Sequence, residues 1–513
     1  MFSTVLTGAF CGIDSYPVQA EVDVAQGLPC MELIGCLSKE AAEAKHRIRV
    51  ALKNVGISLP PSRITINLSP ADRHKSGTAF DLPAAVGLLV SMGLVEAGRT
   101  KGILFAGELG LAGEIKPVKG ILPIVRMASG LGIESCIIPK GNCREAAGAE
   151  GIRIYGTEHL SQLIKALQES FESAGLVEMR TEEEKGTEDE ENTEDFAEVS
   201  GQECARRAAE IAAAGFHNML LIGPPGSGKT MIARRLVSIL PPFSAEERLE
   251  VSAIYSVCGR LPSDGLMKNR PFLSPHHTAT GTSLIGGGRL PVPGAVSLAH
   301  RGVLFLDEMT EFKRNVLDML RQPLEDKKVQ LTRTYGTVAY PADFMLVGAM
   351  NPCPCGYYPD ENRCRCTDAQ IQRYLSHISG PLLDRMDICV EMQKTDTEKL
   401  LRREKGENSQ SIRKRVAVAR GLQQKRFSGN GIRFNSEMGS RELDKYCHLD
   451  EAGEKRLQCA AETFGLSIRA CHRIVRVART IADLEGEERI NAGHISEAVY
   501  YRTAAGSYWE RRG

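Results

Sequence analysis

Apolar and polar residues follow two different periods along this chain, and the change between them predicts where strands and helices lie. Short runs rich in β-forming residues, such as 63–69 (RITINLS) and 102–110 (GILFAGELG), alternate with longer stretches of helical spacing, such as 38–56 and 80–94. This alternation predicts a mixed α/β unit in the first third of the chain.

Residues 178–198 interrupt this pattern, because they carry eleven acidic and two basic residues and no apolar periodicity. A segment that repels itself and has little apolar surface to bury is typical of a solvated linker. After it, residues 204–218 predict a helix and the following MLLIG predicts a strand. A chain of 513 residues is too long for one core, so we expect several folded units.

The overall charge does not indicate a partner, since 64 Lys and Arg balance 64 Asp and Glu. The local balance differs, because residues 401–513 carry 22 basic against 15 acidic residues. No signal peptide and no run of about eighteen apolar residues are present, so we expect a cytoplasmic protein without a membrane partner. Most of the fifteen cysteines stand alone, which favours free thiols over a disulfide framework.

The strongest motif is GPPGSGKT, which has an apolar strand before it and the helical MIARRLVSIL after it. It fits the P-loop pattern G-x-x-x-x-G-K-[ST] in the strand-to-helix setting that the motif requires. Its glycines let backbone N–H groups close around phosphate oxygens, Lys229 reaches the β and γ phosphates, and Thr230 offers a hydroxyl to Mg²⁺. We therefore expect ATP and Mg²⁺ as cofactors, bound by Gly223, Pro224, Pro225, Gly226, Ser227, Gly228, Lys229 and Thr230.

Two further strands complete the predicted nucleotide site. The run GVLFLDE ends in Asp307, which would bind Mg²⁺, and in Glu308, which would orient and polarise the attacking water. The run FMLVGAM is followed by Asn351, whose amide is well placed to hold that water beside the γ phosphate. The three motifs together predict ATP hydrolysis.

These motifs, with GPLLDRMDI, LSIRACHRIVRVARTIADL, FDLP, PHHT and RQPLEDKKV, resemble an AAA+ ATPase of the magnesium-chelatase-like branch. Over essentially its whole length the chain resembles, more narrowly, the bacterial YifB/ComM family. The resemblance implies a multidomain α/β protein with four parts: a Lon-protease-like α/β domain (1–175), an acidic linker (176–198), an AAA+ core with a parallel sheet (199–395) and an all-α C-terminal lid (396–513).

The resemblance also implies self-association into a ring, usually a hexamer, in which ATP lies between subunits. On that basis Arg385 is the candidate arginine finger for the neighbour's ATP, and Arg469 is the candidate sensor arginine of the lid. Two alternatives stay open. Arg385 could form a structural salt bridge with Asp384 or Asp387, and the role of Arg469 could fall to Arg473 or Arg476.

The segment DKKVQLTRTYGTVAYPADF would form a β-hairpin ahead of the Asn351 strand, and the resemblance places this region near a central pore. Lys327, Lys328 and Arg333 could then contact the phosphates of DNA. The stretch before residue 302 is too rich in Gly and Pro for a long helix, and the resemblance implies that it forms a further insertion facing the pore. Its adjacent His276 and His277 lack the i, i+4 spacing of a helical zinc site, so we favour a packing or loop role over metal binding.

Four cysteines directly follow the Asn351 strand in the pattern C-x-C-x₈-C-x-C: Cys353, Cys355, Cys364 and Cys366. Four thiolates on a short Gly- and Pro-containing loop suit tetrahedral Zn²⁺ without an open position, which would make the site structural. Such a clamp would stiffen the connection between Asn351 and Arg385. An iron–sulfur cluster and free thiols are the alternatives.

The N-terminal segments HKSGTAFDLP and GELGLAGEIKPVKGILPIV resemble the Lon protease fold, whose active site pairs a serine with a lysine. In this chain Ala79 stands at the nucleophile position and Leu122 at the lysine position, and neither side chain can transfer an acyl group. We therefore expect a binding or assembly module without peptide cleavage. Ser76 and Lys119 are close in sequence to these positions and could act only under a shifted alignment.

Three functions from different classes follow. The favoured one is a ring-forming ATPase that remodels or moves DNA, with a helicase-like or branch-migration role in recombination or transformation. The second is a chelatase-type ATPase that powers metal insertion through a partner subunit. The third is a regulator in which ATP serves only assembly. Stimulation of ATP hydrolysis by DNA or by a porphyrin would separate them.

Overall fold

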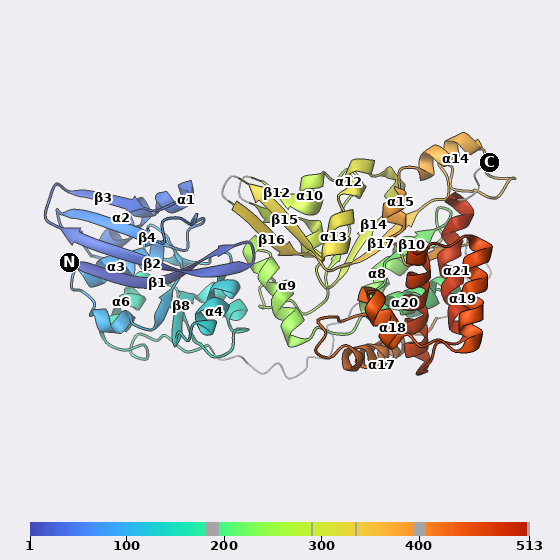
Figure 1. The fold of residues 1–513 in the computed structure, drawn as a ribbon. Helices are drawn as coiled ribbons and strands as arrows, with labels where there is room; N and C mark the ends of the chain where they lie inside the picture. The colour runs from blue at the N-terminus through green and yellow to red at the C-terminus, as the bar shows by residue number, and fades with distance from the viewer. Residues whose placement is uncertain (180–193, 289–290, 334–335, 394–405, 510–513) are drawn as a thin grey trace.

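The computed structural model describes residues 1–179, 194–288, 291–333, 336–393 and 406–509, without the side chains of 333, 336 and 505–507. Three parts follow one another in space in the order of the sequence (Figure 1). They are a mixed sheet with helices, a parallel sheet with helices on both faces, and a group of C-terminal helices. This arrangement confirms the predicted multidomain α/β fold with a helical C-terminal part.

A seven-stranded sheet forms the N-terminal part, in the order β3-β4-β2-β1-β5-β8-β9. Side chains at the start of β1 alternate between exposed and buried, and from Thr7 to Ala9 the strand is buried on both faces. The strands are β1 Phe2–Cys11, β2 Asp14–Ala25, β3 Cys30–Ile34, β4 Arg63–Ser69, β5 Ile103–Phe105, β8 Ser135–Pro139 and β9 Arg153–Thr157. Beside them lies the short pair β6 Glu108–Leu109 and β7 Ile115–Lys116.

Helices pack against this sheet, and α3 is buried at every position because it lies between the strands and other helices. The predicted helix at 80–94 and the predicted strand at 63–69 are therefore confirmed, whereas the predicted helix at 38–56 is divided in two. The helices are α1 Lys39–Ala42, α2 Ala44–Asn54, α3 Asp81–Ser91, α4 Ile121–Gly130, α5 Cys143–Ala146 and α6 Leu160–Gln168.

Five parallel strands form the central sheet, in the order β11-β14-β17-β10-β18. Their apolar runs are continuous because both faces are buried: Leu221 packs in one hydrophobic cluster and its neighbour Leu220 in another. The strands are β10 Met219–Ile222, β11 Phe272–Leu273, β14 Val303–Leu306, β17 Met345–Met350 and β18 Ile388–Glu391. Two hairpins project from this part: β12 Gly286–Gly287 with β13 Val292–Pro293, and β15 Lys328–Arg333 with β16 Gly336–Pro341.

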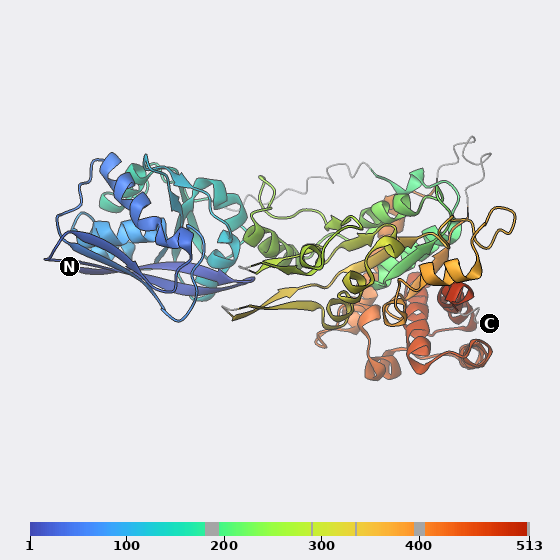
Figure 2. The same ribbon diagram turned by 90° about the horizontal axis from the view of Figure 1, so that it is seen from above.

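The helices around the central sheet connect its strands, and the C-terminal helices lie together on one side of it (Figure 2). Helix α7 Glu203–Gly215 precedes β10, and the connecting helices are α8 Lys229–Ile239, α9 Ala245–Cys258, α10 Gly281–Ile285, α11 Ala295–Leu298, α12 Arg314–Asp318, α13 Arg321–Asp326, α14 Asp368–Leu375 and α15 Gly380–Leu383. The C-terminal helices are α17 Ser409–Arg426, α18 Ser440–Tyr446, α19 Glu451–Phe464, α20 Ile468–Glu485 and α21 Ala492–Trp509.

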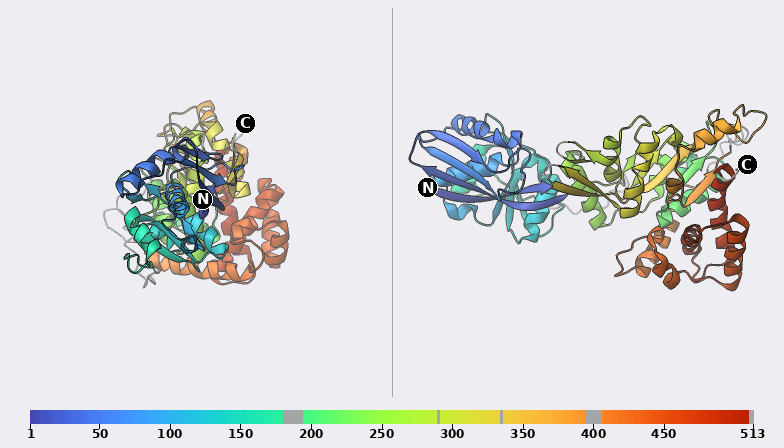
Figure 3. Two further views of the ribbon diagram at one scale, coloured as in Figure 1. Left: turned by 90° about the vertical axis from the view of Figure 1, so that its left-hand side faces the viewer. Right: turned by 45° about the horizontal axis from the view of Figure 1, so that its top comes forward.

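The N-terminal part meets the central part at two places. Both lie at the end of the central part that points away from the C-terminal helices (Figure 3). At the first, α4 lies against α9, and Gly120 N donates to Ser256 O at 3.0 Å. Ser256 Oγ also donates to the buried carboxylate of Glu145 at 2.5 Å, and burial raises the pKa of that carboxyl. At the second, the turn between β1 and β2 touches β16, where a Cβ on Gly12 would lie 2.5 Å from Val338 Cγ1.

Residues 180–193, the middle of the predicted acidic linker, lie outside the described residues. The two ends of that predicted linker are packed, because Leu176 is buried in the N-terminal core and Phe196 is buried beside α7 and α8. Packed structure therefore extends further into 176–198 on both sides than the charge pattern indicates. Among the described residues, no helix is both long and apolar enough to cross a membrane.

Candidate active site

The P-loop lies where the sequence predicts it, between the carboxyl end of β10 and the first turn of α8. Gly226 and Gly228 have φ values of 76° and 87°, a left-handed conformation that favours glycine. Nothing lies within 4 Å of where a Cβ would be at either position, so the space beside these two glycines is open. Backbone N–H groups in such a turn form an anion-binding hollow at the helix N-terminus.

The Lys229 ammonium lies inside the curve of this loop. It donates to the carbonyl oxygens of Gly223 and Pro224 at 2.7 and 2.9 Å and to Asn351 Oδ1 at 3.2 Å. Burial lowers the pKa of Lys229 to about 8, although the charges of Asp307 and Glu308 act in the opposite direction. A bound phosphate group would raise the pKa of Lys229 again, because its negative charge favours the ammonium form. Its oxygens would replace the two carbonyl oxygens as hydrogen-bond acceptors.

The hydroxyl of Thr230 donates to Asp307 Oδ2 at 2.9 Å. A hydroxyl and a carboxylate side by side at the mouth of a P-loop are hard oxygen ligands, which is the donor set that Mg²⁺ prefers. These two residues therefore fit the predicted metal position. When bound there, Mg²⁺ would neutralise charge on the β and γ phosphates.

Parallel pairing explains why residues far apart in sequence meet here. β10, β14 and β17 lie side by side and all run in one direction, so their carboxyl ends reach the same edge of the sheet. The P-loop follows β10, Asp307 and Glu308 follow β14, and Asn351 follows β17. The structure thus brings all the sequence-predicted groups of the nucleotide site to one edge.

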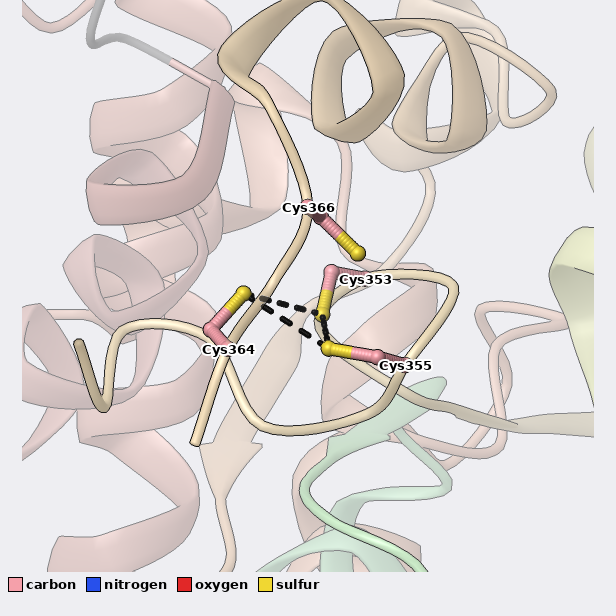
Figure 4. A group of neighbouring side chains, drawn as sticks. All are labelled: Cys353, Cys355, Cys364 and Cys366. Atoms are coloured by element: carbon pink, nitrogen blue, oxygen red, sulfur yellow. Dashed lines mark hydrogen bonds between the residues drawn. The ribbon is translucent and has the colours of Figure 1, made fainter. Parts of the chain in front are cut away.

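The four predicted cysteines also come together (Figure 4). Their sulfur atoms all lie within 4.8 Å of one another, and three pairs are 3.3, 3.6 and 3.7 Å apart. Tetrahedral Zn²⁺ with a Zn–S bond of about 2.3 Å requires sulfur atoms about 3.8 Å apart. The geometry therefore fits one tetrahedral metal ion, held by Cys353, Cys355, Cys364 and Cys366.

The cysteine loop packs directly on the nucleotide site. Cys353 is fully buried, and Gly356 sits so close to the P-loop that a Cβ there would lie 2.6 Å from Pro225 Cδ and 3.8 Å from Asn351 Cγ. Gly356 also has a φ of 85°, so glycine is required here for conformation and for contact. A clamp on this loop would thus fix one wall of the P-loop.

Arg385 and Arg469 lie away from this edge, in a cleft of about 750 Å³. Asn218, which immediately precedes β10, lines the cleft and donates to Arg385 O at 2.9 Å. The P-loop follows the other end of β10, and a strand of four residues spans about 13 Å. The two arginines therefore lie at the opposite end of the sheet from their own chain's P-loop.

Six cations and four carboxylates line this basic cleft. Arg469, Arg473 and Arg476 occupy one face of α20 because their spacing is i, i+4 and i+7. Arg385, Arg473 and Arg476 each keep a buried N–H group without a hydrogen-bond partner among the described residues. Nη1 of Arg473 lies 4.0 Å from Asp387 Oδ1, and guanidinium groups in such a cleft can bind an anion. The remaining charged residues are Arg321, Lys327, Glu325, Asp384, Asp387 and Glu437.

Arg385 does not use either of the aspartates beside it as its ion-pair partner. Its Nη2 donates to Glu325 Oε2 at 2.6 Å, and Glu325 is largely exposed. Asp384 is paired instead with Arg502 at 3.0 Å, and Asp387 lies 3.5 Å from His217. The salt bridge of Arg385 is thus to an exposed partner that a stronger anion could replace.

The β-hairpin predicted before the Asn351 strand is present as β15 and β16. Lys328 is exposed at the base of β15. We expected Lys327 to be free to contact DNA. Instead its ammonium pairs with the buried Asp343, and the side chain lines the basic cleft. The side chain of Arg333 lies outside the described residues.

Ala79 and Leu122, which the sequence comparison with the Lon fold placed at the catalytic positions, carry no group that could form a dyad. Ala79 is buried and Leu122 is fully buried in α4. Ser76 and Lys119 both line a cavity of about 720 Å³ between the N-terminal part and the central part. The stem of Lys119 packs on the C-terminal end of α9, where a Cβ on Gly259 would lie 2.9 Å from Lys119 Cε. The lysine therefore contributes to the junction between the two parts.

The strand order, the P-loop, the acidic pair after β14 and the asparagine after β17 define a P-loop ATPase of the AAA+ class. Comparison with known protein families agrees with this class. The family "Subunit ChlI of Mg-chelatase" matches residues 20–142, "Magnesium chelatase, subunit ChlI" matches 195–400, and "Magnesium chelatase, subunit ChlI C-terminal" matches 406–502.

Individual relatives extend over nearly the whole chain. "Uncharacterized protein YifB" of Salmonella typhimurium is 40% identical over 499 residues, which are 97% of this chain and 96% of the relative. "Competence protein ComM" of Haemophilus influenzae is 39% identical over 499 residues, with 97% of each chain covered. "Lon protease 2" of Bacillus subtilis is a weaker relative, 29% identical over 199 residues, with 34% of this chain and 35% of that protein covered. The chain therefore belongs to the YifB/ComM family of magnesium-chelatase-like ATPases.

Three features of the site were not predicted from the sequence. Arg473 and Arg476 share the cleft with Arg469 instead of competing with it, and their helical spacing would have indicated this. Lys327 belongs to the same cleft, although it adjoins the hairpin. His277, for which we expected only a packing or loop role, lies beside Glu308.

Proposed function

We propose that this protein is a ring-forming ATPase that hydrolyses ATP between subunits and uses the energy to remodel or move DNA. The observation that carries the proposal is the separation of the P-loop from the basic cleft. Arg385 and Arg469 lie too far from their own chain's nucleotide to contact it, yet the buried Nε–H groups of Arg385 and Arg476 have no hydrogen-bond partner among the described residues. A neighbour's γ phosphate is an anion of the right kind for that cleft.

In the proposed mechanism the chain's own residues act in two places. The P-loop and Lys229 would bind the triphosphate, while Thr230 and Asp307 would hold the Mg²⁺ ion. Glu308 accepts a proton from the attacking water, and Asn351 holds that water in position. Arg385 and Arg469 of one subunit pair with the charge that develops on the nucleotide of the next. Hydrolysis would therefore require assembly into a ring, for which we propose a hexamer.

DNA is the substrate class that we favour. One relative is named a competence protein, Lys328 is exposed on the projecting hairpin, and the C-terminal part of the chain is basic. No element of the described structure has the form of a recognition helix, so contacts would be to phosphates and nearly independent of sequence. For the N-terminal part, the loss of both dyad positions supports an assembly module without peptide cleavage.

DNA should stimulate ATP hydrolysis by the purified protein, and the affinity for DNA should fall steeply with salt because phosphate contacts release counterions. Lys328→Ala should reduce the slope of log affinity against log salt by about one. Lys455→Ala is the matched control, since Lys455 is an exposed lysine on α19 that pairs with Glu451. The measurement is ATPase rate and DNA binding by anisotropy between low and moderate salt.

A wild-type protein that responds to no DNA structure at low salt would contradict the DNA proposal. Stimulation by a porphyrin in the same assay would then favour the chelatase-type function. An unchanged ATPase rate with both ligands would favour the regulatory alternative, in which ATP serves assembly alone.

The cysteine cluster should contain about one Zn²⁺ per chain, because four thiolates at these distances form a closed tetrahedral site. Replacing Cys353 and Cys355 by serine should remove the metal and lower the melting temperature by several degrees, since metal binding contributes to folding. Cys459→Ser is the control, because Cys459 is an exposed cysteine on α19. Elemental analysis of protein purified without added metal gives the result. Iron with sulfide in place of zinc, or a folded metal-free protein, would overturn the zinc assignment.

A further inference from the structure

Helix α2 of the N-terminal part has one apolar and one basic side. It lies in the third of the molecule that is furthest from the C-terminal helices (Figure 1). Residues 44–54 include four Lys and Arg, one His and no Asp or Glu, although basic and acidic residues balance over the whole chain. On the apolar side, Ile48 and Leu52 are fully buried in the N-terminal core. On the other side, Arg49 and Lys53 are exposed and Lys45 is partly exposed.

The three cations form a row along this helix. Lys45, Arg49 and Lys53 follow one another at i, i+4 and i+8, so successive members are rotated by about 40° and the row is about 12 Å long. The nearest acidic residue in the sequence, Glu43 at the N-cap, lies about 120° around the axis from Arg49. Among the described residues, the charged groups of the row have no hydrogen-bond or ion-pair partner. The row is therefore an uncompensated line of positive charge.

This row lowers the stability of α2 instead of supporting it. Lys45 lies in the first turn, where the positive end of the helix dipole disfavours a cation, and that turn contains no acidic residue. Like charges at i, i+4 along the row repel one another as well. Arg47 differs, because its guanidinium donates to both carboxylate oxygens of the buried Asp81 at 2.6 and 2.8 Å. Arg47 thus serves the fold, whereas the row has no internal contact that would explain it.

The phosphate backbone of a nucleic acid is the ligand that fits this row. Phosphates of one strand follow one another at about 3.4 Å along the helix axis, so a row of about 12 Å spans three to four of them. A helix that binds a membrane surface must also insert an apolar face into the lipid. The apolar side of α2 is already covered by the N-terminal core, so it offers no such face.

We propose that Lys45, Arg49 and Lys53 form a nucleic-acid-binding surface of the N-terminal part, which contacts phosphates and reads no bases. The inference rests on the proposed function only in the choice of DNA as the nucleic acid. Its surface is separate, because Lys328 belongs to the projecting hairpin of the central part. DNA held at both surfaces would be bound more tightly than at either alone. The N-terminal part then has a role in holding the substrate.

The test is DNA binding by the full-length protein without nucleotide, measured by anisotropy of a fluorescent duplex at several salt concentrations. Lys45→Ala/Arg49→Ala/Lys53→Ala should reduce the slope of log affinity against log salt by about 2.7, since each phosphate contact contributes about 0.9. Its melting temperature should equal or exceed the parental value, because alanine favours the helix and the cation of the first turn is removed. A lower melting temperature would assign the row to the fold and overturn the proposal.

Arg99→Ala/Lys101→Ala/Arg126→Ala is the matched control, because it removes three exposed cations from the same part of the chain. Its slope should remain parental. Equal losses in both triple variants would overturn the proposal, since total charge would then explain the binding. An unchanged slope in the row variant would overturn it too, above all if that variant no longer sedimented with phosphatidylglycerol vesicles, because the row would then bind a membrane surface.

The two proposals about DNA can fail separately. A reduced slope in the row variant, together with a wild-type ATPase rate that DNA does not change, would support this surface and contradict the proposed motor. Stimulation of ATP hydrolysis by DNA, together with a parental slope in the row variant, would support the motor and overturn this surface. A wild-type protein that binds no DNA at low salt would overturn both.

Discussion

Glu308→Gln should bind ATP as the parent does and lose nearly all turnover. The amide keeps the shape of the side chain but cannot take a proton from water, and removal of a general base typically lowers a rate about 10²- to 10⁴-fold. Lys229→Ala should fail at an earlier step, because the lysine contacts the loop that would hold the phosphates. Nucleotide binding by fluorescence and phosphate release at saturating ATP separate the two defects.

Glu311→Gln is a suitable control for this prediction. Glu311 is an exposed carboxylate three residues further on, in the 3₁₀ turn that begins after Glu308. Its replacement changes the same charge in nearly the same place and should leave turnover at the parental value. Parental hydrolysis by Glu308→Gln would show that another group polarises the water.

The nucleotide site was largely predictable from the sequence because its signals are local. A P-loop carries its glycines, lysine and threonine in eight consecutive residues, and each remaining group follows directly after an apolar run. Parallel strands then bring those groups to one edge, so knowledge of the strand direction suffices to place Asp307 and Asn351 together. The cysteines of the cluster were predictable for the same reason, since all four lie within fourteen residues.

The basic cleft was not predictable in this way, because it depends on how distant helices pack. Arg385 comes from the loop before β18, Arg469 from α20 and Lys327 from the end of α13. Neighbouring members of this set are more than fifty residues apart in the sequence, and no local period connects them. The pairing of Lys327 with Asp343 likewise requires the tertiary structure, since Asp343 is buried before β17. The boundaries of the four predicted domains remain predictions.

Arg385→Ala should be inactive as a homogeneous protein and regain activity when it is mixed with Glu308→Gln. Loss of an arginine finger typically lowers kcat by about 10³- to 10⁵-fold. In a mixed ring, some interfaces combine the intact Glu308 of the Arg385→Ala subunit with the intact Arg385 of its neighbour. Those interfaces hold every group that the proposed mechanism needs.

The amount of recovery can be anticipated from the mixing ratio. With equal amounts of both variants and random assembly through head-to-tail contacts, about a quarter of the interfaces would be complete. Phosphate release should therefore rise from background toward about a quarter of the parental rate if interfaces act independently. Titration of one variant into the other should give a maximum near equal amounts.

The double variant Arg385→Ala/Glu308→Gln provides the decisive control, because it can complete no interface with either single variant. Mixing it with Arg385→Ala or with Glu308→Gln should leave the rate at background, which excludes recovery by dilution or by contaminating ATPase. Full activity of Arg385→Ala alone would show that the cleft does not serve the neighbour's nucleotide. Its salt bridge to Glu325 would then be structural, and the buried donors of Arg473 and Arg476 would require a different anion.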